Sequence, residues 1–250
     1  MRVALLLVWW ASNSVLALTA PEASAEKSAV KIAVATNFKT TLQALTDKVH
    51  TAAGYHYQLS AGSSGKLYAQ IRNGAPFSLF FSADQKRPAL LYEQGLADAP
   101  ATYATGSLLL VSASPITDVA QTLNAARRIA IANPQLAPYG AAASQALSHI
   151  PGLSAWQDRL VLGTNIGTTF AMVASRAADT ALVAATQRNP AQAHQLHIHR
   201  LPTELHAPIH QDMAVLPAGR NHPGVRALIE YLTTPEAHAL LVEHGYQANE

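Results

Sequence analysis

The sequence predicts an α/β protein with two lobes, each built on a mainly parallel sheet with flanking helices. Strand-like apolar runs alternate with amphipathic helical segments along most of the chain, which is the pattern of α/β layers. Four of these runs end in small polar residues at which a helix begins at once. The chain has 250 residues, 49% hydrophobic and 13% charged, which suffices for one large or two small domains.

The elements of the amino-terminal region follow in order. Residues 30–35 form an apolar run, and the helix after them shows a single apolar stripe and is ended by Gly54. A second strand is predicted at 55–60, an amphipathic helix at 64–73 and a third strand at 77–82. Strands and helices therefore alternate one by one in this region.

The same alternation continues to the carboxyl end of the chain. We expect a helix after Gly140, a helix near 167–177 and two closing helices, the last over 235–243. The strands predicted between and before these helices are 108–111, 129–132, 160–162, 181–184 and 213–216.

Two spans have the composition of crossings between lobes. No Pro-rich or charged linker divides the chain, but residues 102–107 and 202–211 separate the two series of elements. Two crossings imply that one lobe is inserted in the other. We therefore expect residues 26–107 to begin the first lobe, 108–208 to form the second, and 209–250 to return to the first.

The first 25 residues have the features of a secretory signal. Arg2 precedes an apolar stretch, and residues 23–25 (Ala-Ser-Ala) fit a small-x-small cleavage site. The alternative is a retained membrane anchor, which would need about 20 continuous apolar residues. Polar residues at 12–14 interrupt this segment, so a signal peptide at 1–25 and export to the periplasm are predicted. The sequence is compatible with either a cleaved or a tethered amino terminus.

Composition and motifs exclude several classes of function. The formal net charge is only +2, without the dense basic face that nucleic-acid binding needs. The cysteine count is zero, which excludes thiol nucleophiles, thiolate metal sites and disulfides. The chain has no Gly-x-Ser-x-Gly elbow and no His-Glu-x-x-His helix, and its candidate loops hold no paired carboxylates. We therefore predict that it is not an enzyme.

The four helix starts are the candidate site. They lie at residues 36–37, 62–65, 133–140 and 163–168. The first turn of a helix presents unpaired N–H groups and a partial positive charge, which favour an anion. Open α/β sheets also bind ligands at these strand ends. Taken singly, each loop is explained more simply by helix capping, because Ser, Thr and Asn are the usual N-caps.

The joint chemistry of the loops indicates more than capping. None of the four contains Asp or Glu. The nearest cation, Lys66, could guide anions towards the cleft, but a position on a solvated helix face explains it equally well. Neutral donors suit a dianion whose four oxygens all accept hydrogen bonds, whereas hydrogen phosphate keeps a proton and would need an acceptor nearby. The loops therefore predict a site for a fully deprotonated tetrahedral oxyanion.

Several segments of the chain carry a family resemblance. They are residues 33–38 (AVATNF), 61–67 (AGSSGKL), 74–77 (GAPF), 81–84 (FSAD), 131–134 (IANP), 138–140 (PYG) and 231–237 (YLTTPEA). With these segments the mature chain, from residue 30 to 246, resembles the periplasmic molybdate-binding proteins of ABC importers nearly end to end.

The resemblance implies a type II periplasmic-binding-protein architecture, in which crossover strands join two lobes and an oxyanion lies in the cleft between them. It implies capture of molybdate or tungstate and delivery to an ABC permease in the inner membrane. By position, it implies ligand contacts from Thr36, Asn37, Ser64, Tyr139 and Ile166, the last two mainly through backbone N–H groups. It implies no cofactor and no cation site, and we expect a monomer.

One branch of the family differs at two of these places. It has a serine where this chain has Asn37, and a tyrosine on the strand that here reads Leu182-Val183-Ala184. Ala184 has no hydroxyl to donate. The chain therefore resembles the other branch, in which Thr36 and Asn37 would supply the missing donors.

Two alternative binding functions stay open. A sulfate-like oxyanion could use the same loops, because selectivity depends on the cavity radius. A zinc or copper site could use the histidines between residues 194 and 210, since imidazole is a common ligand of both metals, but no cysteine or paired carboxylate completes a closed site. These histidines are His194, His197, His199, His206 and His210. Asp84 could close the cleft across the lobes, although capping of a helix is its simpler role.

Overall fold

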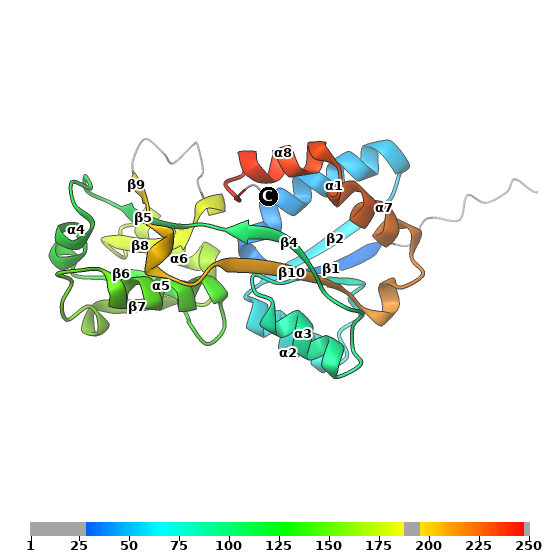
Figure 1. The fold of residues 1–250 in the computed structure, drawn as a ribbon, viewed down its shortest axis with the longest axis horizontal. Helices are drawn as coiled ribbons and strands as arrows, with labels where there is room; N and C mark the ends of the chain where they lie inside the picture. The colour runs from blue at the N-terminus through cyan, green and yellow to red at the C-terminus, as the bar shows by residue number, and fades with distance from the viewer. Residues whose placement is uncertain (1–28, 188–195, 248–250) are drawn as a thin grey trace, which may run out of the picture.

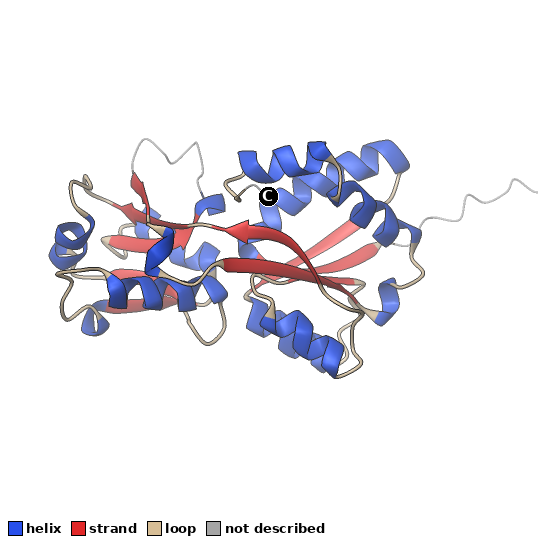
Figure 2. Ribbon diagram, viewed as in Figure 1, coloured by secondary structure: helices blue, strands red, loops and turns tan. Residues whose placement is uncertain are grey.

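The computed structural model describes residues 29–187 and 196–247. They form two five-stranded sheets, placed next to each other and each covered by helices (Figure 1, Figure 2). The signal segment predicted at 1–25 and the predicted ligand His194 lie outside the described residues. No helix of the described part is long and apolar enough to cross a membrane.

The first sheet has the strand order β2-β1-β3-β10-β4. Strands β1, β2 and β3 pair in parallel, and β10 pairs antiparallel with both β3 and β4, so only β10 runs against the other strands. The strands are Val30–Ala35 (β1), Tyr57–Gly62 (β2), Leu79–Phe81 (β3), Ala101–Gly106 (β4) and Ile209–Val215 (β10).

The second sheet has the order β7-β6-β8-β5-β9 and repeats this arrangement. Strands β6, β7 and β8 pair in parallel, and β5 pairs antiparallel with β8 and β9. The strands are Leu108–Ser112 (β5), Ile129–Ala132 (β6), Leu160–Gly163 (β7), Thr180–Ala184 (β8) and His197–Arg200 (β9). The prediction of an α/β fold with two mainly parallel sheets is confirmed.

Helices cover both faces of each sheet, which is why the central strands are apolar along their whole length. In the first lobe, α1, α7 and α8 cover one face and α2 and α3 the other (Figure 1). The helices of the first lobe are Lys39–Ala53 (α1), Ser64–Arg72 (α2), Lys86–Glu93 (α3), Pro223–Leu232 (α7) and Pro235–Glu243 (α8). Those of the second lobe are Val119–Ala125 (α4), Pro138–His149 (α5) and Ile166–Ala174 (α6).

The chain passes between the lobes twice. Strand β4 of the first sheet continues through Ser107 directly into β5 of the second. The return passes through residues 201–208 into β10, which lies beside β4 in the first sheet (Figure 1). Both connections are therefore continuous with paired strands of the first sheet, close to the boundary between the lobes.

Several elements differ from the sequence-based expectation. Helix α5 begins at Pro138, before the predicted start after Gly140, because proline at the first helical position has its φ already set. Strand β10 begins at Ile209, inside the predicted crossing. Helix α3 was expected only through the capping role of Asp84, and helix α4 was not predicted. Strand β9 is exposed along its length, so no apolar run marks it.

Candidate anion site

One small hollow lies where the four predicted helix starts meet. It contains about 210 Å³ of space free of protein atoms, including its open side. All five residues predicted as ligand contacts line it. The first lobe contributes Ala35, Thr36, Asn37, Gly62, Ser63, Ser64 and Ala83, and the second contributes Ala137, Pro138, Tyr139, Asn165 and Ile166.

The topology explains this convergence. Each of the four helical segments follows a strand of the parallel part of its sheet, namely β1, β2, β6 or β7. Parallel strands end at the same edge of a sheet, so the helices that follow them begin at that edge. The edges of the two sheets face each other across the lobe boundary, and the amino-terminal ends of helices from both lobes therefore surround one space.

No residue lining the hollow is charged. The groups available to a guest are backbone N–H groups at helix starts and the hydroxyls and amides of small side chains. These donors, together with the positive ends of the helix dipoles, favour an anion without any formal counter-charge.

Asn37 is buried, and its side chain is committed to protein partners. Its Nδ2 donates to Oε1 of Gln211 at 2.8 Å and to the hydroxyl of Tyr246 at 3.0 Å. Both amide hydrogens are therefore used within the first lobe. The side chain that the sequence predicts as a ligand donor therefore has both of its N–H groups bonded within the protein, while the residue also lines the hollow.

Gln211 is the centre of a buried polar network that links the two lobes. Its side chain is 0% exposed, accepts from Asn37, and donates through Nε2 to the hydroxyl of Tyr139 at 3.1 Å. The hydroxyl of Tyr103 also donates to Gln211 Oε1, at 3.0 Å. Sequence reasoning did not identify Gln211, because nothing in the local pattern of β10 distinguishes it.

The tyrosines of this network are neutral. Burial raises the pKa of Tyr139, and it raises the pKa values of Tyr103 and Tyr246 well above the ordinary tyrosine range. All three hydroxyls therefore keep their protons at neutral pH. The hydroxyl of Tyr139 accepts from Gln211, and the residue also lines the hollow at the start of α5.

Two polar residues predicted from loop composition have clear local roles. The Oγ of Ser64 accepts from the backbone N–H of Ala83 at 2.9 Å, so its own hydrogen is available. Asn165 caps α6: its Oδ1 accepts from the N–H of Thr168 at 3.0 Å, and Thr168 Oγ1 accepts from the N–H of Asn165. In the loop at 163–168, helix capping therefore explains the polar side chains, which is the simpler of the two interpretations given for these loops above.

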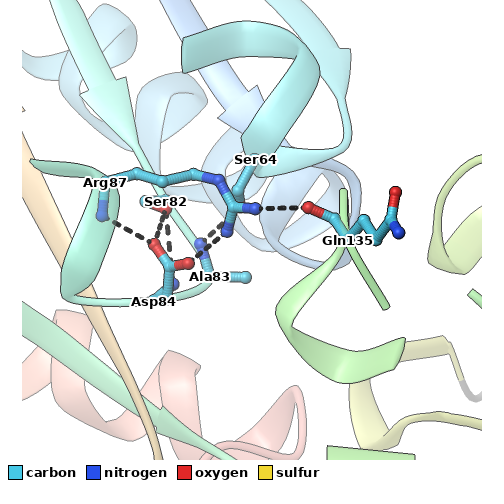
Figure 3. A network of polar contacts seen from close by, with 6 residues as sticks. All are labelled: Ser64, Ser82, Ala83, Asp84, Arg87 and Gln135. Carbon is cyan, nitrogen blue, oxygen red and sulfur yellow. Dashed lines mark hydrogen bonds and ion pairs between the residues drawn. The ribbon is translucent and has the colours of Figure 1, made fainter. Parts of the chain in front are cut away.

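Direct bonds across the lobe boundary lie beside the hollow. The N–H of Gly65 donates to the carbonyl of Leu136 at 2.9 Å. Nη2 of Arg87 donates to the carbonyl of Gln135 at 2.9 Å, as Figure 3 shows. Together these bonds attach the loop before α5 to the first lobe, and we call them the clasp.

The guanidinium of the clasp is held in place from its own lobe. Asp84 forms an ion pair with Arg87 and accepts from the backbone N–H of Arg87, which is the capping role expected of it (Figure 3). Asp84 thus takes part in closing the cleft only through Arg87. At Gly65, a Cβ would lie 3.1 Å from the Leu136 carbonyl oxygen and 3.1 Å from Nη2 of Arg87, so a side chain there would force the clasp partners to shift by a few tenths of an ångström.

The histidines predicted as alternative ligands do not form a cluster in the described residues. His197 and His199 lie on the exposed strand β9. His206 is buried with Nδ1 2.8 Å from the carbonyl of Ala207, and Nδ1 of His210 lies 3.0 Å from Oγ1 of Thr105. Within residues 29–187 and 196–247, no three His, Cys, Asp or Glu residues come together to hold a metal ion.

Comparisons with known proteins agree with this geometry. Residues 30–247 match the family model described as bacterial extracellular solute-binding protein. The chain is 35% identical over 230 residues to the molybdate-binding protein ModA of Azotobacter vinelandii, covering 89% of this chain and 91% of that protein. It is 33% identical over 237 residues to ModA of Rhodobacter capsulatus, covering 93% and 92%.

A solved structure agrees as well. The periplasmic molybdate-binding protein of A. vinelandii superposes with a TM-score of 0.81 at 36% identity, covering 88% of this chain and all of that one. These matches extend over both lobes and both crossings, and they agree with the prediction of a binding protein rather than an enzyme. The chain belongs to the bacterial extracellular solute-binding protein family.

Proposed function

We propose that this protein is an exported solute-binding protein that captures molybdate or tungstate and delivers it to an ABC permease in the inner membrane. The observation that carries the proposal is the single hollow formed by uncharged helix starts from both lobes. An unprotonated dianion with four accepting oxygens matches this set of donors. The names of the ModA relatives support molybdate as the guest.

The proposed ligand contacts are the five residues predicted from the sequence. Thr36 and Ser64 would donate through their hydroxyls, and Asn37, Tyr139 and Ile166 through backbone N–H groups at helix starts. The contacts of Asn37 with Gln211 and Tyr246 support this assignment for Asn37. We further propose the lobe boundaries 26–107, 108–208 and 209–250, cleavage after residue 25, a periplasmic location and a monomeric state.

Calorimetric titration of the mature chain tests the function directly. Molybdate and tungstate are expected to bind with a Kd between micromolar and nanomolar, or roughly −8 to −12 kcal/mol. Because no formal charge lines the hollow, the affinity should change little with salt concentration. Parallel titrations use sulfate, phosphate and zinc. If only sulfate binds, the ligand is sulfate and not molybdate or tungstate. If only zinc binds, the result favours the histidine alternative.

Replacement of Ser64 by alanine is expected to weaken molybdate binding by about 1–3 kcal/mol, since a charge-assisted hydrogen bond is lost. The same change leaves the buried N–H of Ala83 without its acceptor, so the melting temperature should also fall. The matched control is Ser148→Ala on the exposed face of α5, for which calorimetry should give the wild-type Kd. An unchanged Kd for Ser64→Ala would remove Ser64 from the site.

Replacement of Arg87 by alanine is expected to weaken molybdate binding about 3- to 10-fold without removing any ligand contact. The variant loses one bond of the clasp, worth about 1 kcal/mol at this partly exposed position, and the closed arrangement becomes less stable. Most of the change should be a faster dissociation rate, measured by stopped-flow displacement with tungstate.

Lys86→Ala is the control for Arg87→Ala. It removes an exposed cation from the adjacent position, where the structure gives no bond across the lobes. If Arg87 acts only by attracting anions, both variants should slow association equally and leave dissociation unchanged. That result would contradict the clasp.

A further inference from the structure

Ser63 has a buried hydroxyl that the protein itself does not use. The residue is 4% exposed, and no described residue provides a hydrogen-bond partner for Oγ. A buried hydroxyl without a partner costs about 1–3 kcal/mol, so native proteins seldom keep one without a reason.

The position of Ser63 makes the free hydroxyl more unusual. Ser63 is the N-cap residue of α2, where a serine normally accepts a hydrogen bond from the first turn of the helix. Here the side chain makes no capping bond, although the Ser63 carbonyl accepts from the N–H of Leu67 in the ordinary helical way. The hydroxyl is therefore free at a position where a serine usually caps the helix.

The same residue lines the hollow. Ser63 lies between Gly62 and Ser64, both of which also line it, and opposite the start of α5. A hydroxyl at this point can donate its hydrogen to an oxygen of a bound guest, and the positive end of α2 strengthens such a bond.

We propose that Ser63 is a further ligand contact, which donates its hydroxyl hydrogen to one oxygen of the bound oxyanion. This inference rests on the proposed function. The ligand satisfies a group that is unpaired in the empty protein, so part of the binding free energy comes from removing that penalty. Ser63 and Ser64 then form two adjacent hydroxyl donors at one helix start, of which only Ser64 also serves the protein.

The test uses two variants that each delete a buried, unpartnered hydroxyl. Ser63→Ala removes it at the hollow. Thr180→Val removes it in β8, where Oγ1 of Thr180 is also buried without a partner and does not line the hollow. Without ligand, neither variant should melt at a lower temperature than the wild type, because each loses an unsatisfied group.

With molybdate the two variants should differ. Ser63→Ala is expected to raise the Kd about 5- to 50-fold in calorimetry and to show a smaller increase in melting temperature at a fixed molybdate concentration. Thr180→Val should match the wild type in both measurements. For Ser63→Ala we therefore expect weaker binding and no loss of stability in the ligand-free protein. These two results do not occur together if the role of Ser63 is only structural.

Two outcomes would overturn the inference. If Ser63→Ala binds molybdate with the wild-type Kd, the hydroxyl does not contact the ligand. If the variant melts well below the wild type when empty, Oγ has a structural partner, such as a buried water, and the binding loss follows from that. Failure of the proposed function is a separate result, because the wild-type chain itself would then bind neither molybdate nor tungstate.

Discussion

Replacement of Gln211 by leucine is expected to lower the free energy of unfolding by about 2–5 kcal/mol and to weaken molybdate binding at least tenfold. Leucine fills a similar volume but leaves one amide hydrogen of Asn37 and the hydroxyl of Tyr139 without their partner. Each buried polar group left unpaired costs about 1–3 kcal/mol. The binding loss follows because Asn37 and Tyr139 lie on opposite sides of the hollow and Gln211 holds both.

Urea unfolding and calorimetric titration measure these two effects. A double-mutant cycle with Tyr139→Phe separates the link between the lobes from general damage to the core. Since Tyr139→Phe removes the hydroxyl that Gln211 contacts, the two changes should cost less together than the sum of their separate costs. Strict additivity would show that the bond between Gln211 and Tyr139 contributes nothing, and an unfolding free energy within about 0.5 kcal/mol of wild type would contradict the whole prediction.

Replacement of Gly106 by alanine is expected to weaken molybdate binding by more than about 100-fold, or about 2.7 kcal/mol. A Cβ at this position would lie 2.0 Å from the hydroxyl of Tyr139 and 2.7 Å from Nε2 of Gln211. Tyr139 is 1% exposed, so a shift of its ring would require repacking of its own lobe. We expect the lobes to separate instead at the crossing from β4 to β5, which opens the hollow.

Small-angle scattering should report a larger radius of gyration for Gly106→Ala, and calorimetry the loss of affinity. The second-site control is Gly106→Ala combined with Tyr139→Phe, which deletes the nearest clashing atom. Partial recovery of binding is expected, since the ring carbon Cζ would still lie 2.8 Å from the new methyl group. If the double variant binds no better than Gly106→Ala alone, steric contact with the Tyr139 hydroxyl is not the cause.

Much of the fold could be predicted because its signals are local. The central strands β1, β6 and β8 are short apolar runs, and α2 follows a Gly-Ser turn with one apolar face. The weaker elements gave no such signal. Helices α3 and α4 are short, and the edge strand β9 is exposed throughout, so periodicity does not mark them.

The candidate site could be predicted to the level of its loops. Small polar residues without acids at four helix starts are visible in the sequence, and the five selected residues all line one hollow. The sequence did not show which of the two hydroxyls, that of Ser63 or that of Ser64, bonds within the protein, because both residues stand in the same Gly-Ser-Ser-Gly turn. Which hydroxyl is engaged depends on Ala83, which belongs to the end of another strand.

The sequence by itself determined the α/β class, the uncharged helix starts and the resemblance to oxyanion-binding proteins, since each depends on residues close together in the chain. Only the tertiary structure decided which donors remain free for a ligand. The amide of Asn37 turns to Gln211, 174 positions away, and that of Gln211 reaches the opposite lobe at Tyr139. Hydrogen-bond partners depend on which groups lie close together in the folded chain. The local sequence pattern does not indicate contacts between residues so far apart in the sequence.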